Sequence, residues 1–341
     1  MTALGTFSAA PPTDVAGGPS RNAGVRHGVA FGLEIAGTFQ GPGLWTGEEN
    51  GVPRRVSLEM IPAAALERSR ADCGWETLRR IRVDDDGRML ILDGHLEHGY
   101  RVHADGFGSY LISRDGRRVL LAPEPVEAWR WQRLLTAQVL PIASLLQGLE
   151  LFHASAVELD GHGLAFTGGS GAGKSTLAAH LMLAGATFVC DDALAVEGTG
   201  GEVLAHPGPA LMNLRDSTAE LLSADERANL GTRLGCDEAG ARLLVRRAAA
   251  ALPLEAIYVL RRSAGWTGGV RLRRLSPPAP EVLLGAGFGT VIRTSHRLIR
   301  RLDVCALLAA RTAVFAIEAP AQAPPKALAA AVLRQVRQGE P

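Results

Sequence analysis

The sequence predicts a mixed α/β protein in which a small β-rich domain precedes a larger domain of alternating strands and helices. Three observations support this fold class. Residues 27–123 contain short runs of alternating apolar and polar residues, and residues 151–341 alternate between strand-like and helix-like runs. A glycine-rich stretch joins a strand to a helix near the start of the second part. The chain of 341 residues is long enough for two domains.

The composition argues against two classes of partner. Lys plus Arg is 36 and Asp plus Glu is 35, a net charge of +1, whereas a dedicated nucleic-acid binder usually carries a basic excess. The most apolar segment, LLTAQVLPIASLLQGLELF, contains a proline and several polar residues, which favours a buried helix over a membrane span. We therefore expect neither a nucleic acid nor a membrane as partner.

The cysteines and the first residues bear on localisation. Four cysteines form no CxxC pair and have no zinc-ligand spacing, so we expect reduced thiols in a cytoplasmic protein: Cys73, Cys190, Cys236 and Cys305. The N-terminal segment has no charged stretch followed by an apolar run, and thus does not resemble a signal peptide. Its richness in Pro, Gly, Ser, Thr and Ala predicts a disordered tail over residues 1–26.

Residues 27–123 are expected to form the β-rich domain. Strand-like runs extend from GVAFGLEIAG to RRVLLAP, and three dipeptides typical of hairpin turns punctuate them: Asp86-Gly87, Asp93-Gly94 and Asp115-Gly116. The acidic run that begins at Asp84 is interpreted as a solvated turn. Residues 124–150 are predicted to be a connecting helix, which Pro141 should kink or split.

The second domain, residues 151–341, is predicted to begin with a hairpin around Asp160-Gly161. Its second strand leads into the glycine-rich stretch, and GKSTLAAHLMLAG is the helix that follows. ATFVC and LEAIYVLRR are apolar enough to be buried strands. PEVLLGAGFG, LIRRLDVCALLAAR and PPKALAAAVLRQVRQ have helical periodicity, and AVFAIEAP is a late strand.

The glycine-rich stretch, GGSGAGKS, fits the phosphate-binding pattern GxxxxGKS with the required strand before it and helix after it. Glycines let backbone N–H groups surround a phosphate, and the helix adds its positive N-terminal end. Lys174 is expected to bridge the β and γ phosphates. For Thr176, helix capping or packing is an alternative. The expected nucleotide-binding residues are Gly168, Gly169, Ser170, Gly171, Ala172, Gly173, Lys174, Ser175 and Thr176.

An acid pair, Asp191-Asp192, follows the apolar strand. The carboxyl end of a strand is where α/β sheets place their sites. One acid at this place commonly holds Mg²⁺ through water in phosphate-loop proteins, and the Ser175 hydroxyl is expected to ligate the same ion. The predicted metal-site residues are thus Ser175, Asp191 and Asp192. Since adjacent side chains of an extended chain point opposite ways, we expect only one acid to face the phosphate.

These residues together resemble the C-terminal catalytic domain of the HPr kinase/phosphorylase family. In that family a strand histidine, a G-x-S-G-x-G-K-S loop and an apolar strand ending in Asp-Asp recur, as do His153, residues 168–175 and Asp191-Asp192 here. The hairpin HASAVELDG and the opening strand FGLEI resemble shorter HPr-kinase-like proteins, including lasso-peptide tailoring kinases. The resemblance implies that Asp192 accepts the proton of a serine hydroxyl, with His153 and Lys174 assisting catalysis.

The resemblance also implies an ATP- and Mg²⁺-dependent kinase that phosphorylates a serine of a peptide or small protein. Two alternatives stay open: a nucleotide-dependent switch without phosphotransfer, and a kinase acting on free serine, a sugar or an alcohol. Members of the family often form rings, and a homo-oligomer stays open here.

Several arginines are candidates for contact with phosphate or acceptor. Arg215, Arg261 and Arg262 are candidates to neutralise the transferred phosphate, with surface ion pairing as the alternative. The arginine-rich segment 290–301 either receives an acidic peptide or phosphate or forms a solvated helix face.

Overall fold

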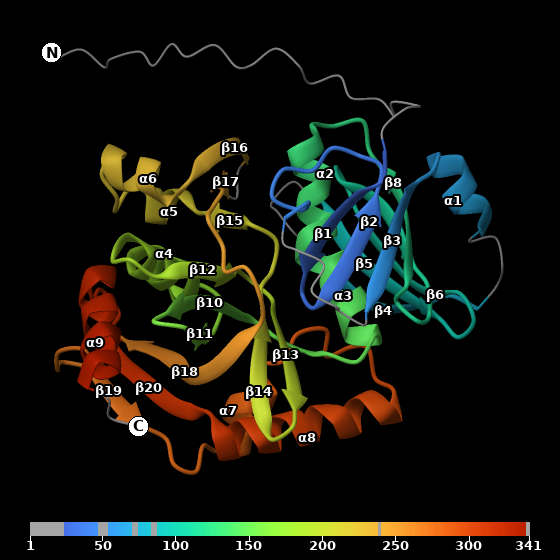
Figure 1. Ribbon diagram of the computed structural model, residues 1–341. Helices are drawn as coiled ribbons and strands as arrows, with labels where there is room; N and C mark the ends of the chain where they lie inside the picture. Colours follow the sequence, from blue (N-terminus) through green and yellow to red (C-terminus); the bar gives the residue numbers. More distant parts are fainter. Residues whose placement is uncertain (1–23, 47–53, 70–73, 83–86, 238–239, 339–341) are drawn as a thin grey trace, which may run out of the picture.

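The computed structural model describes residues 24–46, 54–69, 74–82, 87–237 and 240–338 (Figure 1). The predicted mixed α/β class is confirmed, because large sheets and helices alternate along the chain. Most of the tail expected over residues 1–26 lies outside the described residues, as do Cys73 and the acidic run from Asp84 to Asp86. The other three cysteines are free thiols.

The N-terminal part is an eight-stranded sheet with the order β1-β2-β3-β8-β7-β6-β5-β4, and the helix α1 (Ala63–Ser69) packs beside it. Its strands are β1 (Arg26–Ala30), β2 (Leu33–Gly37), β3 (Arg55–Met60), β4 (Glu76–Arg82), β5 (Met89–His95), β6 (Gly99–Ala104), β7 (Gly108–Ile112) and β8 (Arg118–Pro123). The Asp115-Gly116 turn lies between β7 and β8 as expected, with Gly116 at φ 72°.

The Asp93-Gly94 turn was wrongly predicted, because both residues lie inside β5 and pair with β6. Asp93 tolerates this place because its buried carboxylate accepts hydrogen bonds from Arg101, at 2.9 Å, and from Thr77, at 2.8 Å. A buried aspartate needs such partners. The chain reverses between His95 and Gly99 instead, which are the last paired residues of this hairpin.

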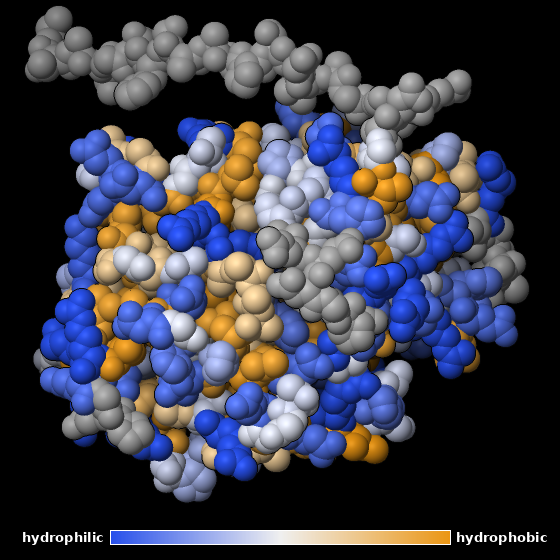
Figure 2. All heavy atoms as spheres, viewed as in Figure 1, coloured by the Kyte–Doolittle hydropathy of each residue, from blue (hydrophilic) through white to orange (hydrophobic). Residues whose placement is uncertain are grey.

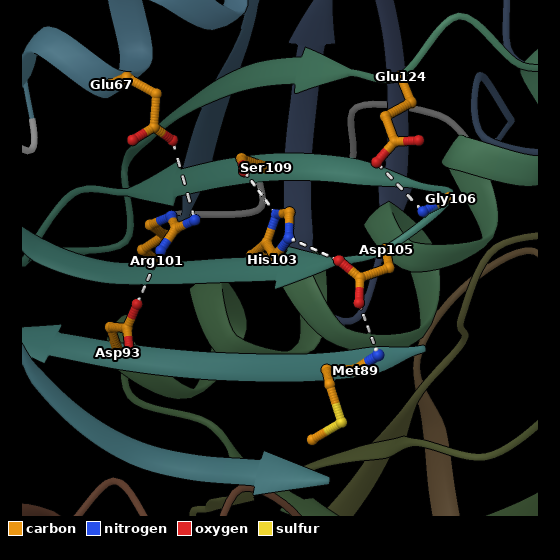
Figure 3. Close-up of polar contacts among 9 residues, drawn as sticks. All are labelled: Glu67, Met89, Asp93, Arg101, His103, Asp105, Gly106, Ser109 and Glu124. Atoms are coloured by element: carbon orange, nitrogen blue, oxygen red, sulfur yellow. Dashed lines mark hydrogen bonds and ion pairs between the residues drawn. The ribbon is translucent and has the colours of Figure 1, made fainter. Parts of the chain in front are cut away.

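A polar cluster on the same sheet brings a histidine, a serine and an aspartate together (Figure 3). Ser109 lies directly opposite His103 in the β6–β7 register, and its Oγ is 2.8 Å from His103 Nδ1. Asp105 lies 3.2 Å from His103 Nε2 and accepts a bond from the backbone N–H of Met89 at 2.9 Å. That backbone bond is the main reason why the pKa of Asp105 is lowered. The cluster thus fastens the β6–β7 turn to the start of β5.

The connecting segment is two α-helices separated by a π-helical turn, namely α2 (Ala128–Leu134), η1 (Leu135–Val139) and α3 (Leu140–Leu146). Pro141 lies just after the π turn. Because proline has no N–H to donate and its ring crowds the preceding turn, the regular helical bonding is interrupted there. Thr136 of η1 donates to the Gln132 carbonyl, and its hydroxyl oxygen faces the second part of the chain.

The second part is built on a nine-stranded sheet with the main order β12-β10-β11-β18-β14-β13-β9, in which β20 pairs with β18 and β19 with β20. Strands β11, β18 and β20 are parallel. The nine strands are β9 (Glu150–Phe152), β10 (Ala154–Leu159), β11 (His162–Thr167), β12 (Thr187–Cys190), β13 (Leu194–Thr199), β14 (Glu202–His206), β18 (Leu252–Ser263), β19 (Arg271–Arg274) and β20 (Ala313–Pro320).

The predicted hairpin around Asp160-Gly161 joins β10 to β11, and both turn residues have positive φ, 53° and 85°. Two positive φ values are what a tight two-residue hairpin requires. One sheet face packs against α4 (Lys174–Leu183) and α9 (Pro325–Gln338), the other against α7 (Pro280–Gly285) and α8 (Ser295–Arg311) (Figure 1).

A small third sheet with the order β15-β17-β16 carries two short helices and lies beside α2 and α4 (Figure 1). Its elements are β15 (Leu211–Leu214), α5 (Asp216–Ala219), α6 (Ala224–Leu230), β16 (Thr232–Asp237) and β17 (Gly240–Leu244). On the face seen in Figure 2, hydrophilic residues are spread widely, and hydrophobic residues gather mainly over the half that carries α4, β18 and α9.

One hydrophobic core crosses the expected boundary at residue 150. Leu33 and Ile35 of the N-terminal sheet belong to the same buried cluster as Leu151, Ala193 and Ala195 of the second part. Helices α2 and α3 contribute to this cluster as well. The two parts of the chain therefore share a core instead of being joined by the connecting helix alone.

Candidate active site

A cavity of about 570 Å³ lies where β11 and β12 end. Both strands run antiparallel to β10, so their carboxyl ends reach the same edge of the sheet. Of the residues expected from the sequence, those lining the cavity are His153, Ser170, Gly171, Gly173, Lys174, Ser175, Thr176, Asp191, Asp192 and Arg215. A larger hollow of about 690 Å³, near the other ends of β11, β18 and β20, is lined by none of the expected site residues.

The glycine-rich loop has the backbone that binding a phosphate requires. Gly173, the residue before α4, has a φ of 96°, and Gly171 a φ of 75°. These values favour glycine, and at Gly171 a Cβ would meet nothing within 4 Å, so the backbone is open to an approaching group. Residues 168–173 thus form a turn that is exposed at residues 169–171 and leads into the N-terminus of α4.

Lys174 is the first residue of α4, and its side chain, only 7% exposed, reaches back to the loop. Its ammonium donates to the carbonyl oxygens of Gly168, at 3.2 Å, and Gly169, at 3.3 Å. Burial lowers the pKa of Lys174, while the carboxylates of Asp192 and Asp191 act in the opposite direction. The lysine is therefore a cation held at the cavity beside two acids.

Three oxygen-bearing side chains converge at the base of the cavity. The hydroxyls of Ser155 and Ser175 each donate to the same carboxylate oxygen of Asp191 at 2.7 Å, and the backbone N–H of Asn213 donates to the other oxygen at 3.3 Å. Burial, and then the charge of Asp192, raise the pKa of Asp191 to about 6. A bound cation would relieve both effects.

This donor set fits Mg²⁺, which prefers oxygen ligands and keeps several of its waters. Among the described residues no group of three or more histidine, cysteine, aspartate or glutamate side chains is arranged to hold a metal. A hydroxyl with one or two carboxylates is nevertheless the usual protein contribution where phosphates complete the shell. Ser175, Asp191 and Asp192 are the residues that would hold the ion.

Both acids line the cavity, and which of them would face a bound phosphate stays a prediction. Asp192 leaves the extended conformation and has a φ of 67°. The alternation of an extended strand therefore does not apply to the pair. Left-handed backbone is uncommon for a residue other than glycine, although aspartate and asparagine tolerate it best. Such strain often accompanies functional sites.

His153 contacts the acid pair through its ring. Its Nδ1 is 2.9 Å from the backbone carbonyl oxygen of Asp192. Because a carbonyl oxygen only accepts, Nδ1 must carry the hydrogen, which leaves Nε2 free of a proton in the neutral ring. Burial, and then the nearby charge of Lys174, lower the pKa of His153. The histidine is therefore neutral at pH 7 and orients the backbone that presents the Asp192 carboxylate.

Five expected residues are not among those that line the cavity, namely Gly168, Gly169, Ala172, Arg261 and Arg262. Ala172 packs against the core formed by the α4 face of the sheet, and the side chain of Arg262 lies beside Gly173 and donates to the Ala323 carbonyl at 3.2 Å. Arg261 is exposed at the end of β18 and is not among the cavity-lining residues. Thr176 both lines the cavity and contacts the Thr218 hydroxyl at 2.8 Å.

The arginine-rich segment 290–301 is not a solvated face throughout. Arg297 is 4% exposed and donates to Glu150 at 3.1 Å and to two backbone carbonyls. Arg301 donates to the Leu284 carbonyl. Because these arginines fasten α8 to the rest of the molecule, they are not available to receive an acidic peptide.

Several residues at or behind the cavity were not identified from the sequence, and three of them support the acid pair: Ser155, Asn213 and Arg242. Ser155 lies on β10, whereas His153, which was expected on a strand, lies at the bend between β9 and β10. The two-residue spacing of a strand therefore does not relate the two side chains. Asn213 and Arg242 lie opposite each other on β15 and β17. This pairing of two strands cannot be predicted from the residues next to either one.

The chain was compared with protein families, curated proteins and solved structures. No protein-family model matches the chain, and no curated protein matches it. The solved structure of an Hpr(Ser) kinase/phosphatase from Coxiella burnetii is similar over 56% of this chain and 99% of that one, with 15% identity and a TM-score of 0.30. A TM-score this low decides neither fold nor function, so both rest on the residues. Within the described residues, every helix is too short or too polar to cross a membrane.

Proposed function

We propose that this protein is a P-loop kinase that transfers the γ-phosphate of ATP, with Mg²⁺, to a hydroxyl group. One observation carries the proposal: the glycine-rich loop, Lys174 and the acid pair line a single cavity. A phosphate bound by the loop would therefore lie beside a carboxylate that can accept a proton. Kinases need this juxtaposition, because positioning and charge neutralisation supply most of the rate of phosphoryl transfer.

Each residue has a role in this proposal. The N–H groups of the loop and the Lys174 ammonium bind the nucleotide phosphates. Bound Mg²⁺ would supply charge neutralisation at the phosphates, and Ser175 and Asp191 would hold it. Asp192 accepts the proton of the acceptor hydroxyl while that oxygen forms its bond to the γ-phosphorus. The bond from phosphorus to the oxygen of ADP breaks, and ADP leaves with that electron pair. His153 keeps the Asp192 backbone in place.

For the acceptor we propose a serine of a peptide or small protein, on the strength of the motifs shared with the HPr kinase/phosphorylase family. A small hydroxyl compound would use the same site and differ only in the acceptor pocket. A nucleotide switch would bind ATP through the same loop but would need no proton acceptor. The strained backbone of Asp192 favours a kinase, since it turns the carboxylate toward the cavity.

The test is incubation with γ-labelled ATP and Mg²⁺ in the presence of serine-containing peptides, HPr and free serine. Asp192→Asn suits the experiment, because asparagine tolerates left-handed backbone and leaves the shape of the site intact. We expect labelling of one acceptor by the wild type, loss of at least 100-fold in Asp192→Asn with ATP still bound, and weaker ATP binding in Lys174→Ala.

Asp216→Asn is the matched control, because Asp216 is an exposed acid on the rim of the same cavity. It should keep its activity. Equal labelling by wild type and Asp192→Asn would refute the role of Asp192. ATP hydrolysis with no labelled acceptor in a broad panel would favour the switch.

A further inference from the structure

Arg242, on β17, is a buried cation that the proposed chemistry does not use directly. Its side chain is 5% exposed, and burial lowers its pKa to about 10, so it stays charged at neutral pH. Burying an arginine is costly unless its donors are satisfied. Its two terminal nitrogens donate to the Asn213 side-chain oxygen at 2.7 Å and to the Thr136 hydroxyl at 2.6 Å.

The bond to Asn213 determines which way that amide faces. A guanidinium can only donate, so it requires the amide oxygen, Oδ1, on its own side. The amide nitrogen, Nδ2, then faces the opposite way, where it lies 3.5 Å from a carboxylate oxygen of Asp192. Without Arg242 the amide would lose its short hydrogen bond, and the 3.5 Å contact with the carboxylate is too long to hold the amide in place by itself.

The same asparagine contacts the second acid through its backbone, whose N–H donates to Asp191. Asn213 thus lies between Arg242 and both carboxylates. The other anchor of Arg242, Thr136, belongs to η1 of the connecting segment, 106 residues earlier in the chain. The guanidinium therefore joins the π-helical turn to the acid pair through a single amide.

We propose that Arg242 is a positioning residue of the active site: it fixes the Asn213 amide so that Nδ2 holds the Asp192 carboxylate toward the acceptor. The inference rests on the proposed role of Asp192 as proton acceptor. It adds that the connecting segment supports the catalytic acid through Thr136. Displacing a catalytic group by about 1 Å can cost on the order of 100-fold in rate, so loss of this support should be measurable.

Arg247 provides a matched control. It is a partly buried arginine whose pKa is lowered to about 10 by burial, as for Arg242, and its guanidinium donates to the backbone carbonyls of Gly208 and Thr46. These bonds join separate parts of the chain without touching Asp191, Asp192 or Asn213. A variant at Arg247 thus reports the loss of a buried arginine with a structural role only.

The first experiment measures phosphate transfer and thermal unfolding for Arg242→Met, Asn213→Ala, the double variant and Arg247→Met. We expect Arg242→Met to lower kcat about 10- to 100-fold with the KM for ATP within about twofold. The double variant should have a kcat no lower than that of Asn213→Ala, because Arg242 acts through Asn213 and the two changes break the same linkage. Arg247→Met should lower Tm and leave kcat within about twofold. The inference would be overturned if the losses of kcat in the two single variants multiplied in the double variant, or if Arg242→Met left kcat unchanged.

A second experiment separates this inference from the proposed function. The crystal structure of Arg242→Met should show the Asn213 amide turned away from Asp192, whether or not an acceptor has been found. An amide that still places Nδ2 against the carboxylate would overturn the inference while leaving the kinase proposal intact. A wild type that labels no acceptor, together with a displaced amide, would refute the kinase proposal and support the positioning role.

Discussion

Asp191→Asn should make the nucleotide-free protein more stable and inactive. The pKa of Asp191 is raised from 3.8 to about 6 by burial and by its neighbour Asp192. A shift of about 2 pKa units corresponds to on the order of 3 kcal/mol of destabilisation once the carboxylate is ionised. Asparagine can still accept the two hydroxyl bonds of Ser155 and Ser175 through its oxygen. It loses the bond from the Asn213 N–H and leaves that buried donor facing an amide NH₂ group, at a cost of about 2 kcal/mol. The net gain at neutral pH is about 1 kcal/mol.

The pH dependence has a definite sign. Because the folded state binds the Asp191 proton more tightly than the unfolded state, the wild type loses stability as the pH rises from about 4 to about 6, and the loss is complete above that range. The advantage of Asp191→Asn should therefore be present at pH 8 and disappear below pH 4. It should also shrink when Mg²⁺ and ADP are added, since only the wild type retains the carboxylate that we propose as a ligand of the ion.

The assay is urea unfolding of both proteins in chelator at pH 8, pH 6 and pH 4, with Asp216→Asn as a control. The control removes one acidic charge from an exposed part of the same cavity and should change the free energy of unfolding by no more than about 0.5 kcal/mol. A variant less stable than the wild type at pH 8, or a gain that is the same at all three pH values, would refute this account of Asp191.

Three further predictions concern other parts of the molecule. Glu197→Gln should destabilise the protein by on the order of 2 kcal/mol at pH 7. The hydrogen bond from His206 is the main reason why the pKa of Glu197 falls to about 2, so the ionised carboxylate stabilises the folded state. This stabilisation is present above pH 4.5 and is lost as the pH falls toward 2. The difference in unfolding free energy between wild type and variant should therefore be smaller at pH 3 than at pH 7 in denaturant unfolding. Leu308→Ala, at a fully buried position of α8, should cost about 2–5 kcal/mol in the same assay, whereas Ile299→Ala, at a position 60% exposed, should cost under about 0.5 kcal/mol. Gly173→Ala forces a Cβ onto left-handed backbone at φ 96° and should weaken ADP binding about tenfold in calorimetry; unchanged affinity would mean that the loop conformation is not needed.

The parts of the molecule that sequence predicts well are those determined by neighbouring residues. The glycine-rich loop and the Asp160-Gly161 hairpin depend on local backbone preferences, and the structure has a turn at each. The helix interruption at Pro141 follows from the missing N–H of proline. Asp93-Gly94 shows the limit of local patterns, because a buried partner from the next strand, Arg101, outweighs the turn preference of the dipeptide.

The support around the acid pair could not be predicted, because it depends on contacts between distant segments. Arg242 meets Thr136 across 106 positions of sequence, and Asn213 reaches Asp191 across 22. Taken alone in the sequence, each of these residues could equally be a surface residue or an ordinary strand residue. The left-handed backbone of Asp192 is similarly invisible in the sequence, since aspartate is tolerated there but not required.

The hydrophobic core that crosses residue 150 limits which recombinant chains can fold, because residues from both sides of residue 150 pack in it. Ala193 directly follows the acid pair and is packed in the cluster that contains Leu33 and Ile35 of the N-terminal sheet. A crossover near residue 150 that replaced one half by a foreign sequence would place mismatched side chains directly beneath Asp191 and Asp192. The first half contributes Arg133 to the lining of the cavity and packs beneath the acid pair, so we expect the two halves to be inherited together.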